Sequence, residues 1–204
     1  MLKENSVLRR EAREALEGNW LMSAVALLIY MAIAGVCSAI PMVGWILTIV
    51  VCLPISWGLY IMFYQLHRDR KLPALETLFI GFQDFGRILG TMLLMQVYIF
   101  LWSLLLVVPG IIKACSYAMT PYILREHPEL SYNSAIEKSM AMMEGNKMKV
   151  FLLYLSFIGW AILCILTLGI GYLFLAPYMN TSLAAFYADL KAQGANASEE
   201  TVVA

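Results

Sequence analysis

Lys113 is an ionisable residue in an unusual position, because it lies alone inside a long apolar tract. Between Ile88 and Leu124 it is the single Asp, Glu, Lys or Arg. A charged side chain within a membrane-spanning segment is a functional hypothesis by default. One interpretation is that Lys113, three residues after Pro109-Gly110, extends its ammonium to the outer headgroups along its own apolar stem. The other is that it binds an anionic headgroup or substrate.

Prolines inside apolar segments form the second group of residues with a potential binding role. A proline removes a backbone donor and frees the carbonyl one turn earlier, as Pro121 does for Tyr117. In transporters, broken helices with nearby polar groups line sites at the membrane midplane. Elsewhere a proline only kinks a helix whose neighbours satisfy the free carbonyl. With Lys113, the candidate contacts for a ligand or lipid are Tyr117, Pro121, Pro177 and Asn180.

Catalytic and metal-binding signatures are absent from the sequence. His67-Arg68-Asp69 has the letters of a kinase catalytic loop, but no Asn follows at the required spacing. The second histidine, His127, stands alone in another polar segment, so the histidines do not have metal-ligand spacing. The apolar tracts contain no paired carboxylates for a proton relay. The sequence therefore predicts a protein that is not an enzyme and has no cofactor.

The composition excludes an ordinary soluble domain. Hydrophobic residues make up 61% of the 204 residues and charged residues 14%, with a mean hydropathy of +0.74. A soluble domain of this length is about half apolar and a quarter charged. The excess apolar surface must face lipid. The formal net charge is zero, so no basic excess indicates a nucleic-acid partner.

Tracts without charge define six predicted transmembrane helices. A span of the hydrocarbon needs roughly 20 apolar residues. The first tract follows a stretch with as many acids as bases, which is wrong for a signal peptide, so it is predicted to be retained. The six predicted spans are residues 20–40, 44–64, 88–108, 111–124, 150–167 and 170–188.

A loose threefold repeat organises these spans into hairpins. Each repeat has an amphipathic stretch, a glycine and two apolar segments, with a proline inside the second. Phe63-Tyr64 matches Phe186-Tyr187 between the first and third repeats. The predicted fold is an all-α polytopic membrane helix bundle of three hairpins, each preceded by a cytoplasmic amphipathic helix. Its repeats cover residues 3–66, 73–126 and 131–190, and a polar, disordered tail covers residues 191–204.

The amphipathic stretches are predicted to lie in the plane of the membrane surface. A glycine after each stretch is expected to adopt the left-handed conformation that ends a helix. Ser134 and Glu137 have the spacing of a capping box. The predicted apolar faces are Leu8, Ala12, Ala15 and Leu16; Leu75, Leu78, Phe79, Phe82 and Phe85; and Ile136, Met140 and Met143. The glycines are Gly18, Gly86 and Gly145.

The basic residues set the predicted orientation. Lysines and arginines occupy the long polar segments before, between and after the hairpins, and the short turns hold none unless Lys113 is counted. By the positive-inside rule the long polar segments are cytoplasmic. The chain is therefore predicted to cross the membrane several times, with both termini in the cytoplasm.

The run Pro109-Gly110-Ile111-Ile112-Lys113, followed by Ser116-Tyr117, resembles an uncharacterised bacterial integral-membrane family, domain of unknown function 975. The similarity continues through Gly145-Asn146-Lys147 and ends most clearly at Leu155-Ser156-Phe157-Ile158-Gly159-Trp160. At the start of the chain, Arg13 and Gly18-Asn19-Trp20 also look like this family. The resemblance implies a bacterial membrane protein. It implies no reaction, ligand or catalytic residue.

These observations favour a non-enzymatic membrane module that binds a partner protein or lipid. Its expected partners are membrane lipids, another membrane protein or a second copy of the chain. The alternative is a permease or exporter subunit for a small amphiphilic substrate, which would use the proline-broken helices. A lipid-modifying enzyme is a third and weaker interpretation, because no span combines a nucleophile, a base and an orienting partner.

Overall fold

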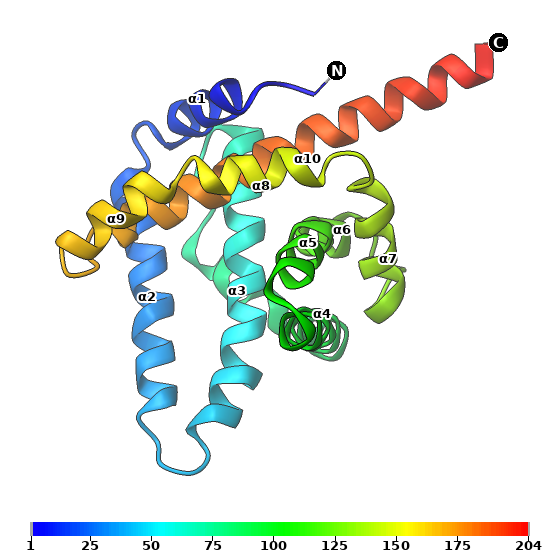
Figure 1. The fold of residues 1–204 in the computed structure, drawn as a ribbon. Helices are drawn as coiled ribbons and strands as arrows, with labels where there is room; N and C mark the ends of the chain where they lie inside the picture. The colour runs from blue at the N-terminus through cyan, green and yellow to red at the C-terminus, as the bar shows by residue number, and fades with distance from the viewer. Residues whose placement is uncertain (1, 204) are drawn as a thin grey trace.

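The protein is all-α, as the sequence predicts (Figure 1). A computed structural model describes the backbone of residues 2–203 and the side chains of residues 2–194. The helices are α1 (Asn5–Leu16), α2 (Trp20–Ser38), α3 (Gly44–Asp69), the 3₁₀ helix η1 (Leu75–Phe82), α4 (Phe85–Leu105), α5 (Val107–Tyr117), α6 (Thr120–Glu126), α7 (Tyr132–Met142), α8 (Lys147–Leu155), α9 (Ile158–Leu166) and α10 (Tyr172–Val203).

Five helical segments of the described chain are long and apolar enough to cross a membrane. They are α2, α3, α4 and two pairs of consecutive helices, Val107–Glu126 and Lys147–Leu166. The predicted sixth span, residues 170–188, falls mainly in α10, which begins at Tyr172 and is not among these segments. Polar residues at 180–182 lower the hydropathy of that stretch. The arrangement of six spans is therefore not confirmed.

The helices of the predicted hairpins contact one another, but the three pairs point in different directions. α2 packs on α3, α4 packs on α5, and both α8 and α9 pack on α10. In Figure 1, α2 and α3 run down the view, α8 to α10 run across it, and α4 is seen end on. The hairpins diverge from a common centre instead of lying parallel. α10 continues to Val203, through the segment predicted as a polar tail, and residue 204 lies outside the described residues.

Three of the five apolar segments face outward and two are more deeply buried. In the most apolar stretch of α2 and of α4, 22% of the residues are buried, and in that of Lys147–Leu166 only 17% are buried. The corresponding values are 50% for α3 and 56% for Val107–Glu126. Large apolar side chains such as Leu21, Phe100 and Ile165 are exposed on the outward-facing segments. Such extensive exposed apolar surface fits a membrane-embedded protein.

The prolines affect their helices in different ways. Pro54 and Pro177 lie inside α3 and α10, which continue past them. At Pro121 the chain breaks instead: α5 ends at Tyr117 and α6 begins at Thr120. Pro121 thus occupies the first turn of a new helix, where a backbone N–H would have no intrahelical acceptor. The expected disruption by proline is strongest in the middle hairpin.

Two of the three amphipathic stretches form α-helices with the predicted apolar residues turned inward. In α1, the side chains of Leu8, Ala12, Ala15 and Leu16 are buried, and the helix packs on α10 and α3. In α7, Ile136 is buried, and the helix packs on α4 and α6. The apolar faces are therefore covered by the same chain and contribute to the core.

The predicted capping box of Ser134 and Glu137 is wrong. α7 begins at Tyr132, and the reciprocal hydrogen bonds of the box join Ser131 and Ser134. The helix therefore starts three residues earlier than its Ser-x-x-Glu spacing indicated.

The second amphipathic stretch is the 3₁₀ helix η1, and the prediction of one apolar face is wrong. Leu78 is buried, whereas Phe79, Phe82 and Phe85 are exposed. Side chains three residues apart eclipse one another in a 3₁₀ helix. The rings of Phe79 and Phe82 accordingly stack, with centroids 6.5 Å apart. The Phe82 ring also stacks on that of Phe85, the first residue of α4, with centroids 6.0 Å apart. A helix of 3.6 residues per turn would have placed these rings differently.

The expected left-handed glycines are present after two of the three stretches. Gly18 has a φ of 76° and Gly145 a φ of 74°, so each ends a helix where the chain reverses. The prediction is wrong for Gly86, which lies inside the first turn of α4. There the chain enters the helix after Asp84 without a left-handed residue.

Candidate functional site

Lys113 lies between α4 and α5, facing two aromatic rings. Its Nζ is 4.9 Å from the centre of the Trp102 ring and 5.9 Å from the centre of the Tyr117 ring. Aromatic faces attract an ammonium because of the ring quadrupole. Among the described residues, no carboxylate lies within 4.0 Å of this ammonium. The structure thus brings together two of the predicted candidates, Lys113 and Tyr117.

Three of the candidates, Tyr117, Pro121 and Asn180, line two small cavities that share Tyr60. Tyr117 and Pro121 line a cavity of about 140 Å³, together with Tyr154. Asn180 lines a separate cavity of about 220 Å³ between α2, α3 and α10. Tyr60 lines both cavities. Pro177 is buried within α10. The predicted residues therefore do not form one site.

A carboxylate that sequence reasoning missed joins three inner helices, α3, α6 and α10. Glu126, the last residue of α6, accepts hydrogen bonds from Tyr64 Oη at 2.6 Å and Tyr187 Oη at 2.8 Å. Lys191 Nζ donates a third at 2.8 Å. We call these four residues the Glu126 junction. The matching Phe-Tyr pairs of the first and third repeats were its signal in the sequence.

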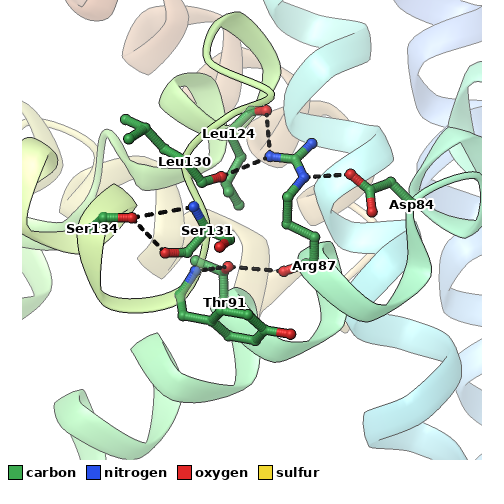
Figure 2. Close-up of polar contacts among 8 residues, drawn as sticks. Asp84, Arg87, Thr91, Leu124, Leu130, Ser131 and Ser134 are labelled. Atoms are coloured by element: carbon green, nitrogen blue, oxygen red, sulfur yellow. Dashed lines mark hydrogen bonds and ion pairs between the residues drawn. The ribbon is translucent and has the colours of Figure 1, made fainter.

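A second polar cluster, centred on Arg87, fixes α7 against the start of α4 (Figure 2). The Arg87 guanidinium pairs with Asp84 and donates to the carbonyl oxygens of Leu124 at 3.1 Å and Leu130 at 3.0 Å. Thr91 Oγ1 donates to the Arg87 carbonyl and accepts the backbone N–H of Tyr132. These contacts join the start of α4 to the end of α6 and to the start of α7.

A groove with ligand-binding character, of about 510 Å³, lies between α1, α2, α9 and α10. We call it the Arg13 groove, after the only charged side chain among its described lining residues. This volume is typical of small-molecule sites, which range over roughly 300–1,000 Å³. Its lining residues are Arg13, Trp20, Trp160, Leu163, Cys164, Thr167, Gly171, Phe174, Leu175 and Tyr178.

The groove has a polar end and an apolar end. The Arg13 guanidinium lies 6.0 Å from the centre of the Tyr178 ring, and the Trp20 ring packs 6.3 Å from that of Tyr178. Gly171 and Thr167 lie toward the turn between α9 and α10. At about 1.5 Å per residue, Gly171 is roughly 10 Å from Tyr178 along α10. The charge is therefore at one end of an otherwise largely apolar channel.

A smaller groove of about 290 Å³ between α5 and α8 has a similar composition. Lys147 is its single charged lining residue, and the remainder includes Val108, Ile112 and Phe151. The sequence did not predict either groove, because each is lined by helices that are distant along the chain.

The described residues offer no metal site, since they contain no group of three or more His, Cys, Asp or Glu side chains placed to hold an ion. The four cysteines are free thiols. The arrangement provides apolar channels with a cation at the rim, which is suited to binding an amphiphile.

Comparison with protein families identifies a family that covers most of the chain. A family described as a protein of unknown function (DUF975) matches residues 1–116 and residues 103–194. Neither a curated protein nor a solved structure matches the chain.

Proposed function

Because the chain belongs to the DUF975 family of proteins of unknown function, we propose its function from the Arg13 groove: it is a non-enzymatic membrane module that binds membrane lipid. The observation that carries this proposal is the lining of the groove. Apolar and aromatic side chains form its walls, and an arginine lies at one end. Acyl chains bury apolar surface well in such a channel.

The position of the groove supports lipid as the occupant. The walls contributed by α9 belong to an outward-facing segment in which Leu163 is 52% exposed. In a membrane such a surface is in contact with acyl chains. A lipid can therefore enter the groove from the side without opening the fold.

Blocking the groove should remove bound lipid. We expect Leu163→Trp to fill the channel and reduce the amount of phospholipid that remains with the protein after purification in mild detergent. The measurement is native mass spectrometry combined with quantification of extracted phospholipid. Ile162→Trp is the matched control, because Ile162 is a neighbouring exposed residue of α9 outside the groove lining. Equal lipid content in both variants and in the unmodified protein would contradict the proposal.

We propose a bacterial cytoplasmic membrane as the location, with both termini in the cytoplasm. The support is the distribution of lysine and arginine in the long polar segments. Single cysteines introduced at Arg70 and Lys147, in a chain whose native cysteines are replaced, should react with a membrane-impermeant maleimide only after cell lysis. Labelling of intact cells at either position would overturn this orientation.

A permease for an amphiphilic substrate is the second candidate function. It is favoured by the two cavities that share Tyr60 as a lining residue, since their linings include Asn180 and several tyrosines. Proteoliposomes should then move a fluorescent short-chain phosphatidylcholine between leaflets, and Asn180→Leu should slow the movement. The rate in protein-free vesicles is the baseline. A rate equal to that baseline would exclude this candidate.

A further inference from the structure

We infer that the Arg13 groove selects an anionic phospholipid, with the Arg13 guanidinium on its phosphate and an acyl chain along α9 and α10. This inference rests on the proposed lipid-binding function and adds the headgroup class.

Arg13 carries a charge that the described part of the chain does not neutralise. No carboxylate of the described residues lies within 4.0 Å of its guanidinium. Arg10, on the same helix, instead pairs with Glu14 at 3.7 Å. An exposed arginine without an ion pair has its donors free for a ligand. Arg13 therefore differs from its neighbour on α1.

A second arginine strengthens the positive potential at this end of the groove. Arg9 precedes Arg13 by one helical turn, a spacing that places both on the same side of α1. The Arg9 Nε is buried and has no hydrogen-bond partner among the described residues. Arg9 does not line the groove, so it adds positive potential near Arg13 and makes no direct contact with the groove.

The Arg13 guanidinium lies over the ring of Tyr178, with Cζ 6.0 Å from the ring centre. The cation lies over one aromatic face, which limits its freedom before a ligand binds. Tyr178 is itself fixed by contacts with Trp20 and Phe157, at ring-centre distances of 6.3 and 5.1 Å. A guanidinium with a restricted position loses less entropy on binding a phosphate. Arginine also matches phosphate geometry with two parallel donors.

The direction of the groove agrees with a phospholipid of the inner leaflet. α1 belongs to the segment proposed to be cytoplasmic, and the apolar end of the groove lies toward the turn between α9 and α10. A lipid with its phosphate at Arg13 would extend its chain toward the membrane interior. No acidic side chain lines the described groove, so an ammonium headgroup would find no partner there. This asymmetry favours an anionic lipid over a zwitterionic one.

The test is a titration of the delipidated full-length protein by native mass spectrometry. The probes are dioleoyl phosphatidylglycerol, which is anionic, and dioleoyl phosphatidylcholine, which is zwitterionic with the same chains. We expect tighter binding of the anionic lipid, and Arg13→Gln should weaken that binding by about tenfold, the effect of losing one charge-assisted contact. The affinity of Arg13→Lys for the anionic lipid should lie between those of the unmodified protein and Arg13→Gln, because lysine keeps the charge but loses the paired donors.

Arg10→Gln is the matched control, since it removes a charge from the same helix without changing the lining of the groove. An Arg13→Gln protein that keeps the full preference for the anionic lipid overturns this inference. If Leu163→Trp still removes bound lipid in that case, the proposed function stands and only the headgroup assignment fails. If neither lipid binds the unmodified protein, the proposed function and the headgroup inference are both wrong. A polypeptide that co-purifies in the groove in place of lipid also overturns both.

Discussion

Gly58→Ala is expected to lower the midpoint of thermal unfolding in detergent more than any other single methyl addition to α3. An added Cβ at residue 58 would lie 2.7 Å from the carbonyl carbon of Leu78 and 2.8 Å from the carbonyl oxygen of Thr77. Both are backbone atoms of η1, which cannot move aside as a flexible side chain can. Overpacking of this kind costs about 3 kcal/mol.

Gly35→Ala provides the matched control for this prediction. Gly35 lies in α2, the other helix of the same hairpin, and a Cβ there would meet nothing within 4 Å. Alanine is favoured over glycine in a helix by about 1 kcal/mol, so this variant should be as stable as the parent or slightly more stable. If Gly58→Ala unfolded at the parent temperature, η1 would not be packed against α3 as the structure has it.

The second large effect is expected from Arg87→Met. The Arg87 side chain is only 16% exposed and pairs with Asp84 while donating to the carbonyls of Leu124 and Leu130. Methionine keeps much of the apolar stem but leaves both carbonyls and the carboxylate without this donor. Removing one partner of a largely buried charged network costs about 2–4 kcal/mol. Thermal unfolding followed by circular dichroism in detergent measures the loss.

Arg68→Met is the comparison for this second variant. Arg68 pairs with the adjacent Asp69, but its side chain is 61% exposed. Exposed ion pairs contribute about 0–1 kcal/mol, so the midpoint should change little. Similar losses for the two variants would show that the Arg87 contacts do not hold α7 on α4.

Local patterns in the sequence predicted the elements whose structure is determined locally. The apolar face of α1 and the left-handed glycines at residues 18 and 145 follow from helical periodicity and from backbone conformation. The 3₁₀ form of η1 could not be predicted in this way. Apolar residues three apart are compatible with either helix type, and the choice here accompanies the close packing of Gly58 under η1.

The candidate site was less predictable, because its residues meet only in the folded chain. Lys113 and Tyr117 lie one turn apart, so their proximity follows from the helix itself. Arg13 lies over the ring of Tyr178, and Glu126 accepts hydrogen bonds from tyrosines of two other hairpins. No periodicity within one segment contains that information. The direction of the three hairpins depends in the same way on contacts among α3, α6 and α10.

The Glu126 junction has a consequence for the order in which the chain is assembled during translation. The ribosome produces Tyr64 first and Glu126 next, whereas Tyr187 and Lys191 emerge only near the end of synthesis. A nascent chain that ends before residue 187 can supply the carboxylate with one of its three donors. The last hairpin therefore supplies the remaining hydrogen-bond donors to a carboxylate that was synthesised some sixty residues earlier. The contacts that join the three hairpins at Glu126 are completed late in biogenesis.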